Sequence, residues 1–158
     1  RELNEGVINV LHKNSPESKD GMDVAICKIN HEEKTLEYAG AMRPLWIVNE
    51  SGLHEIKADK IPIGTRPSEN EPPISYTCHE IKINPNDAYY IFTDGFADQF
   101  GGPKAKKFST ARLKELLIKN HNSDFRIQER NLRNEHYDWK GHTEQVDDIL
   151  VIGFSVKN

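Results

Sequence analysis

The chain has 158 residues, with 21 Lys and Arg against 25 Asp and Glu, so its formal net charge is −4. This balance disfavours nonspecific nucleic-acid binding, and no apolar run approaches the length of a transmembrane helix. The hydrophobic content of 36% is low for a self-contained domain, as expected if part of the core lies elsewhere. Cys27 and Cys78 lack CxxC spacing, which predicts two buried thiols in a reducing, cytoplasmic compartment. A membrane anchor elsewhere in the parent protein is left open.

Hydrophobic periodicity and turn residues predict hairpins in succession, with helices at the flanks. The spacing of Leu3, Val7, Val10 and Leu11 predicts an opening helix, which a polar loop over 13–19 follows. A helix is predicted over 110–119, and Ser123 is expected to cap another that runs to about residue 139. The predicted strands cover residues 22–30, 35–40, 44–49, 53–57, 74–83, 88–92 and 149–154. This order predicts an α+β layered domain.

Two acidic corners, far apart in the sequence, flank the apolar strands 88–92 and 149–154. Thr93-Asp94-Gly95-Phe96-Ala97-Asp98 follows the first strand, and Val146-Asp147-Asp148 precedes the second. Carboxylates on such rigid supports suit Mn²⁺ and Mg²⁺, which prefer oxygen ligands and can activate a bound water. Each corner also has an ordinary interpretation, because Asp-Gly after a strand is commonly a turn and Asp-Asp before a strand is commonly a solvated edge.

Longer strings around these corners favour the metal interpretation. The segments 91–104 and 144–153 resemble the later motifs of bacterial metal-dependent serine/threonine protein phosphatases of the stage II sporulation protein E family, relatives of the type 2C phosphatases. Asp20-Gly21-Met22-Asp23-Val24-Ala25 and Leu36-Glu37-Tyr38-Ala39-Gly40-Ala41 are similar to that family too. The resemblance covers nearly the whole chain and implies two antiparallel sheets packed between helical layers, an α-β-β-α sandwich.

The resemblance implies a set of site residues and two Mn²⁺ or Mg²⁺ ions as cofactors. Asp94 is expected to bind metal, with Asp147 as its partner across the site and Asp148 completing the shell or orienting water. These three carboxylates are the expected catalytic residues. Asp98 matches a position that helps to hold an additional ion in the wider family, and Gly95 belongs to the same metal corner.

Basic residues near these motifs are candidates for substrate contact. Lys104 and Lys106 lie beside the Asp94 corner, where they could steer a phosphoprotein, although lysine clusters are commonly just solvated. Arg43 replaces part of a turn that carries other residues in many relatives, and it could bind a phosphate oxygen.

Two earlier motifs of the family, Gly-Asp and Asp-x-x-Gly-His-Gly, do not occur in this sequence. They supply the carboxylate that bridges both metals, and Asp20, in a turn before a strand, is a weak substitute. The resemblance therefore predicts that residues 1–158 are the C-terminal portion of a single phosphatase domain, missing its N-terminal strands and inactive by itself.

The resemblance also implies partners. The expected substrate is phosphoserine or phosphothreonine on a signalling protein, for which an anti-sigma-factor antagonist is one candidate. An N-terminal sensor or response module is expected in the parent, and a homodimer is left open. The alternative hypothesis is a catalytically incomplete, phosphatase-like module that binds or dimerises with a signalling partner.

Overall fold

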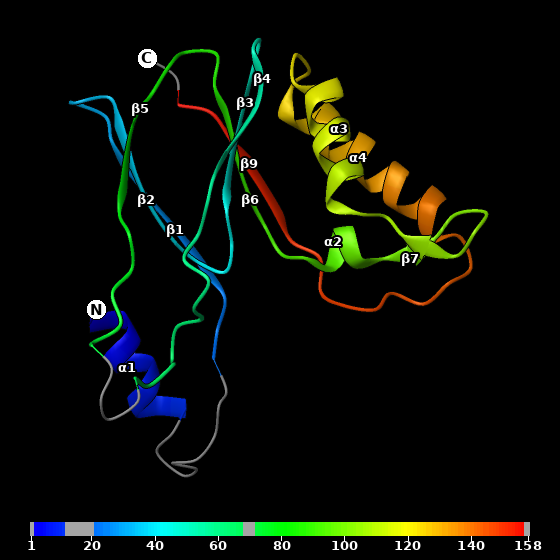
Figure 1. The fold of residues 1–158 in the computed structure, drawn as a ribbon. Helices are drawn as coiled ribbons and strands as arrows, with labels where there is room; N and C mark the ends of the chain where they lie inside the picture. Colours follow the sequence, from blue (N-terminus) through cyan, green and yellow to red (C-terminus); the bar gives the residue numbers. More distant parts are fainter. Residues whose placement is uncertain (1, 12–20, 68–71, 157–158) are drawn as a thin grey trace. The chain divides into compact units, whose positions relative to one another are not determined.

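A computed structural model of the protein describes residues 2–11, 21–67 and 72–156. The loop predicted over 13–19 and the candidate Asp20 lie outside the described residues. The chain divides into two compact units, the first formed by Arg1–Leu45 and Ile56–Ile83 and the second by Trp46–Glu55 and Asn84–Asn158. Figure 1 follows the elements of each unit along the chain.

The first unit contains one helix and an antiparallel sheet. The helix is α1 (Glu2–Leu11), and the sheet has the order β1-β2-β5, formed by β1 (Val24–Asn30), β2 (Thr35–Ala41) and β5 (His79–Lys82). The β1–β2 hairpin pairs Val24 with Ala41 at one end and Asn30 with Thr35 at the other. The hairpin predicted from the sequence is confirmed.

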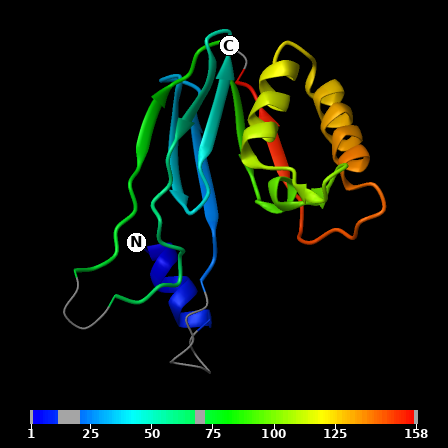
Figure 2. The same cartoon turned by 45° about the vertical axis from the view of Figure 1, so that its right-hand side comes forward.

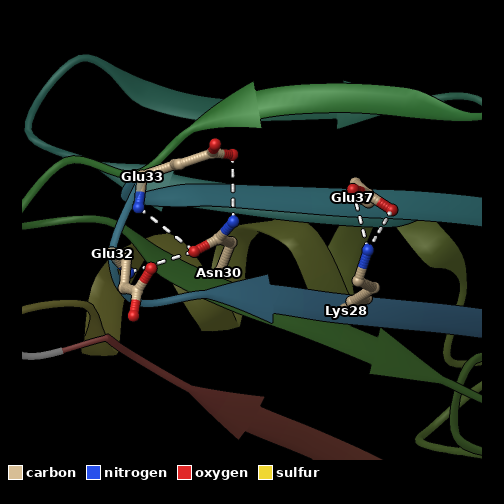
Figure 3. Close-up of polar contacts among 5 residues, drawn as sticks. All are labelled: Lys28, Asn30, Glu32, Glu33 and Glu37. Carbon is tan, nitrogen blue, oxygen red and sulfur yellow. Dashed lines mark hydrogen bonds and ion pairs between the residues drawn. The ribbon is translucent and has the colours of Figure 1, made fainter.

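Asn30 organises the turn of this hairpin (Figure 3). Its side-chain oxygen accepts the backbone N–H groups of Glu32 at 3.0 Å and Glu33 at 3.1 Å, and its amide donates to the Glu33 carboxylate at 2.9 Å. An Asn side chain that bonds the backbone two residues ahead stabilises a turn in place. Further along the strands, Lys28 and Glu37 form a cross-strand ion pair at 3.1 Å.

Helix α1 does not bury the apolar face that its spacing predicts. Leu3 and Val10 are 49% and 76% exposed, whereas Asn4 is buried. The Asn4 side chain accepts the backbone N–H of Gly64 at 2.8 Å and donates to the Thr65 carbonyl at 3.4 Å. The residue that ties α1 to the rest of its unit is therefore polar, a role that periodicity does not reveal.

The second unit combines a four-stranded antiparallel sheet with three helices and a short hairpin. The sheet has the order β4-β3-β6-β9. Its strands are β3 (Leu45–Asn49), β4 (Gly52–Ile56), β6 (Ala88–Phe92) and β9 (Val151–Phe154), and the other elements are α2 (Gly95–Asp98), α3 (Thr110–Asn120), α4 (Phe125–Lys140), β7 (Phe100–Gly101) and β8 (Lys106–Lys107). The views in Figures 1 and 2 agree that α3 and α4 lie side by side.

A contiguous apolar core joins the sheet of the second unit to its helices. Its buried members are Trp46, Val48, Ala88, Tyr90, Phe96, Phe108, Leu113, Leu117 and Leu132. Tyr90 satisfies its hydroxyl by donating to Gln128 of α4 at 2.6 Å, and burial raises the pKa of Tyr90 to about 12. The α+β class with antiparallel sheets, predicted from the sequence, is confirmed.

Three local predictions are wrong. The strand predicted over 74–83 is shorter, because the Thr77 N–H donates to the Asp59 side chain at 2.7 Å instead of to a neighbouring strand. Asp124, not Ser123, caps α4, and its carboxylate accepts the Arg126 N–H at 2.8 Å. Cys78 is exposed rather than buried, while Cys27 is half-buried.

In the described parts of the chain, no helix is long and apolar enough to cross a membrane.

Candidate functional site

The two acidic corners meet in the second unit through Thr93. The Thr93 N–H donates to the Leu150 carbonyl at 3.0 Å, and the Leu150 N–H donates to the Thr93 hydroxyl at 2.9 Å. The same hydroxyl donates to the Asp148 carbonyl at 2.9 Å. These bonds continue the pairing of β6 with β9, so that the residue before Asp94 is fixed to the backbone of Asp148.

Gly95 lies against the backbone of the second corner. A Cβ atom built on Gly95 would lie 2.4 Å from the Asp148 carbonyl oxygen, well inside contact distance. Only a residue without a side chain fits between the start of α2 and the 147–149 backbone. The glycine of the Asp-Gly pair therefore serves the packing of the corner.

Asp94 and Asp98 lie at the two ends of the one-turn helix α2. Asp94 is its N-cap, is half-buried, and accepts the Asp98 N–H at its backbone carbonyl at 2.9 Å. The Asp98 carboxylate pairs with Lys107 of β8 at 2.8 Å. The sequence does not predict this ion pair, because the partners meet only through the β7–β8 hairpin.

Asp147 and Asp148 are both exposed. The Asp147 carboxylate accepts the backbone N–H of Asp148 at 2.7 Å, and the Gln145 side chain donates to the Asp147 carbonyl at 2.8 Å. Asp147 therefore lies in a short, locally bonded turn directly before the segment that Thr93 holds.

Gln99 anchors the loop that leads to these aspartates, a role that sequence reasoning missed. Gln99 is fully buried, and its amide donates to the carbonyls of Phe100 at 3.0 Å and Glu144 at 2.9 Å. The Thr143 hydroxyl adds a bond to the Phe100 carbonyl at 2.7 Å. A Gln directly after an acidic helix carries no distinctive signal, so only the fold reveals that it connects the two corners.

The basic candidates differ in their surroundings. Lys104 lies in the exposed turn between β7 and β8, and Lys106 lies exposed in β8. Arg43 belongs to the first unit, where its guanidinium pairs with Asp23 at 2.5 Å. Arg43 is thus engaged by a carboxylate of its own unit.

The carboxylate oxygens at the acidic corners are the type of ligand that a hard divalent cation prefers, but among the described residues too few of them are grouped together to hold one. Carboxylate oxygens are what Mn²⁺ and Mg²⁺ prefer, and the segments carrying Asp94 and Asp148 are joined. Within residues 2–11, 21–67 and 72–156, however, no three His, Cys, Asp or Glu side chains are grouped closely enough to hold a metal ion. The described residues by themselves therefore form no complete coordination shell.

Comparison with known proteins identifies relatives of this fold. The SiaA-PP2C domain of Pseudomonas aeruginosa matches with a TM-score of 0.83 and 22% identity, over 98% of this chain and 59% of that one. The Mn-presoaked phosphatase domain of the cell fate determinant SpoIIE from Bacillus subtilis matches with a TM-score of 0.65 and 12% identity, over 97% and 63%. The RsbU and RsbW domains of a Mycobacterium tuberculosis protein match with a TM-score of 0.60 and 19% identity, over 90% and 38%.

The chain thus spans about three fifths of the length of the first two of these structures. No curated protein sequence matches it. The family model described as Stage II sporulation protein E matches residues 1–157. The chain therefore belongs to the Stage II sporulation protein E (SpoIIE) family.

Proposed function

We propose that this chain is the C-terminal portion of a single phosphatase domain that hydrolyses phosphoserine or phosphothreonine on a signalling protein. The observation that carries the proposal is the junction of the two acidic corners through Thr93, Gly95 and Asp148. Membership of the SpoIIE family and the likeness of the fold to solved PP2C phosphatase domains support it. Residues outside this chain would complete the site, since no three His, Cys, Asp or Glu side chains of the described residues are grouped closely enough to hold a metal ion.

In this proposal Asp94, Asp147 and Asp148 hold Mn²⁺ or Mg²⁺ at the junction, with Asp98 as a further ligand. A bound divalent cation would neutralise phosphoryl charge and lower the pKa of a water. Thr93 and Gly95 set the separation of the two corners, and Gln99 holds the loop before Asp147. Because the Asp147 carboxylate bonds the next backbone N–H and Asp98 pairs with Lys107, both contacts compete with metal binding.

The proposed substrate side involves Lys104 and Lys106, whose exposed ammonium groups would attract a phosphorylated protein. Arg43 could contact a phosphate oxygen only after its ion pair with Asp23 is broken. The RsbU and RsbW domains in the name of one structural neighbour, and the regulatory-domain fragment in the name of another, support a signalling context. From this we propose an anti-sigma-factor antagonist as substrate and a regulatory module in the parent.

The second candidate is a phosphatase-like module that binds a signalling partner without catalysis. The incomplete carboxylate group and the Asp98–Lys107 ion pair favour it. In the wider family Asp98 matches a metal-holding position, yet here a lysine already compensates its charge.

Activity of the natural protein containing these residues tests the first candidate. With Mn²⁺ and a phosphoserine peptide, Asp94→Asn and Asp147→Asn should each lower turnover by several orders of magnitude without unfolding the protein. The matched control is Asp138→Asn, the same chemical change on the exposed surface of α4. Wild-type turnover in Asp94→Asn would contradict the assignment, and a wild-type protein without activity would favour the binding module.

Calorimetric titration of the 158-residue chain with Mn²⁺ separates a partial site from a complete one. Weak binding that Asp147→Asn abolishes is expected for a partial shell. Tight, stoichiometric binding would mean that these residues supply the missing carboxylate themselves.

A further inference from the structure

The segment that follows α2 carries a local excess of positive charge. Residues 99–113 include no Asp or Glu, although the whole chain has more acidic than basic residues. The basic residues of this segment are all exposed, and they are Lys104, Lys106 and Lys107 of the β7–β8 hairpin and Arg112 in the first turn of α3. These four residues form the basic surface of the second unit.

The basic surface adjoins the first acidic corner, and most of its charge is not compensated. Lys107 pairs with Asp98, at the end of the helix that Asp94 caps. Among the residues that the structure describes, Lys104, Lys106 and Arg112 have no carboxylate within ion-pair distance. Exposed cations therefore lie next to the candidate site without an acidic partner from this chain's described residues.

Trp139, in the last turn of α4, holds the hairpin that carries the lysines. Its indole N–H donates to the Gln99 carbonyl at 3.1 Å, and its own carbonyl accepts the Gly102 N–H at 2.8 Å. A Cβ atom built on Gly102 would lie 2.6 Å from the Trp139 ring, so the hairpin backbone lies directly against that ring. Figure 1 shows β7 beside this end of α4.

The same ring holds the arginine of the basic surface. The Arg112 guanidinium lies 4.2 Å from the centroid of the Trp139 ring, a favourable arrangement for a cation and an aromatic face. Buried Phe108 packs edge-on against Trp139 with ring centroids 5.5 Å apart, which fixes the ring from within the core. Trp139 thus joins Arg112 and the hairpin lysines into one surface.

This support is needed, because the hairpin is too short to hold its own shape. Strands β7 and β8 have two residues each, and an isolated hairpin is marginally stable at best in water. The like charges of its lysines also repel one another. The contacts of Trp139 therefore hold the cations in place before any ligand arrives, which lowers the entropy that a ligand must lose on binding.

We propose that the basic surface binds an acidic segment of the phosphorylated substrate protein, and that Trp139 is the residue that positions this surface. The identity of the partner rests on the function proposed above, and the inference deepens it by naming the substrate class, phosphoserine or phosphothreonine flanked by Asp and Glu. The carboxylates of the segment pair with Lys104, Lys106 and Arg112. The net charge of −4 disfavours a nucleic acid as the partner.

An NMR titration of the 158-residue chain at low salt tests the surface. The probe is an acetylated, amidated peptide, Gly-Glu-Asp-Ser-Glu-Asp-Gly, without phosphate and without metal. The amide resonances of Lys104 and Lys106 and the indole N–H of Trp139 should shift, whereas the indole N–H of Trp46, which donates to Glu55, should not. A peptide with Gln and Asn in place of Glu and Asp should cause no shifts. Equal shifts with both peptides, or none with the acidic one, would overturn the proposal.

Charge variants identify the residues that bind the peptide. Lys104→Gln combined with Lys106→Gln should raise the dissociation constant about fivefold at low salt and less at high salt. The matched control combines Lys119→Gln with Arg130→Gln, at exposed positions of α3 and α4, and should have little effect. Equal effects of the two double variants would contradict the assignment. A single-stranded oligonucleotide that binds as tightly as the peptide would overturn it in favour of a general polyanion site.

A double-mutant cycle tests the positioning role of Trp139. Trp139→Phe keeps an aromatic ring but removes the N–H that bonds to Gln99, so it should weaken peptide binding. This effect should disappear when Lys104 and Lys106 are already Gln, because the hairpin then has no lysines to position. An equal effect in both backgrounds would overturn the positioning role. Arg112→Gln, at an exposed position, should weaken binding without touching the core, and unchanged binding would exclude Arg112 from the surface.

The outcome is separable from that of the proposed function, because the peptide titration involves neither phosphate nor metal. In the natural protein, a phosphoserine peptide with acidic flanks should have a lower KM than one with Gln and Asn flanks. Turnover with equal KM values and no binding of the acidic peptide would overturn this inference and keep the phosphatase. Binding of the acidic peptide without turnover of either phosphopeptide would keep the surface and contradict the phosphatase.

Discussion

Thr93 and Leu150, 57 residues apart, form a reciprocal pair in which each backbone N–H donates to the other residue. In one direction the acceptor is the Leu150 carbonyl, and in the other it is the Thr93 hydroxyl rather than its carbonyl. The hydroxyl thereby remains able to donate to Asp148. One threonine thus fixes the start of one acidic corner to the end of the other.

Replacing Thr93 by Val should destabilise the protein and loosen this junction. The variant keeps the shape of the side chain but leaves the Leu150 N–H and the Asp148 carbonyl without their partner, which should cost ~1–3 kcal/mol. Urea unfolding monitored by tryptophan fluorescence measures the change. Thr110→Val, at an exposed position that starts α3, is the matched control and should change stability far less. Equal effects at both positions would contradict a special role for the Thr93 hydroxyl.

Gly95→Ala and Gly6→Ala should have opposite effects on stability. At Gly95 the added methyl meets the Asp148 carbonyl oxygen, a backbone atom that cannot rotate away, so we expect a loss of ~1–3 kcal/mol. At Gly6, within α1, no atom lies within 4 Å of the added methyl, and helix propensity should stabilise the variant by ~0.5–1 kcal/mol. Thermal unfolding measures both. A neutral Gly95→Ala would mean that the corners are not in close contact.

Gln99→Leu should release the loop before Asp147. The substitution keeps the buried volume but removes the amide that donates to the carbonyls of Phe100 and Glu144. Since those carbonyls lose a partner, we expect a loss of ~1–3 kcal/mol and faster amide exchange over residues 143–148. Asn134→Leu, at an exposed position of α4, is the control. Unchanged exchange in Gln99→Leu would show that the loop is held by other contacts.

Acid should destabilise the second unit through His136. Burial lowers the pKa of His136, and the positive charge of Lys140 lowers it further. Because the folded-state pKa lies below the unfolded value of about 6.5, the unfolded chain binds more protons, and stability falls as the pH drops below that value. His136→Leu should flatten this dependence, whereas His142→Leu, at an exposed position, should keep it. An identical slope in His136→Leu, measured by urea unfolding from pH 7 downward, would contradict the assignment.

The two cysteines should differ in reactivity. Burial raises the pKa of Cys27, so little thiolate forms there near neutral pH, whereas Cys78 is exposed. Iodoacetamide should therefore modify Cys78 first, as measured by intact-protein mass spectrometry, and Cys78→Ser should remove the fast phase. Loss of the fast phase in Cys27→Ser instead would reverse the assignment.

Local sequence signals were sufficient for most elements of this fold. The β1–β2 hairpin, strand β6 and helix α3 follow from apolar patterning and from turn and cap residues near them, because those interactions link residues close in sequence. The family resemblance likewise rests on contiguous motifs around Asp94 and Asp147. The Asp-Gly pair predicted a corner. It did not predict that Gly95 is needed for a backbone contact with Asp148, 53 residues away.

The remaining features depend on contacts between distant residues. Buried Asn4 and Gln99 carry no pattern that separates them from surface amides, and the Asp98–Lys107 ion pair depends on the β7–β8 hairpin. That Trp139 holds this hairpin also depends on the fold, because Gln99, which accepts its indole N–H, lies 40 residues away in the sequence. The sequence by itself determined the elements and the two acidic corners, whereas the tertiary structure decided how the corners join and which polar groups are buried, since these depend on long-range packing and hydrogen bonding.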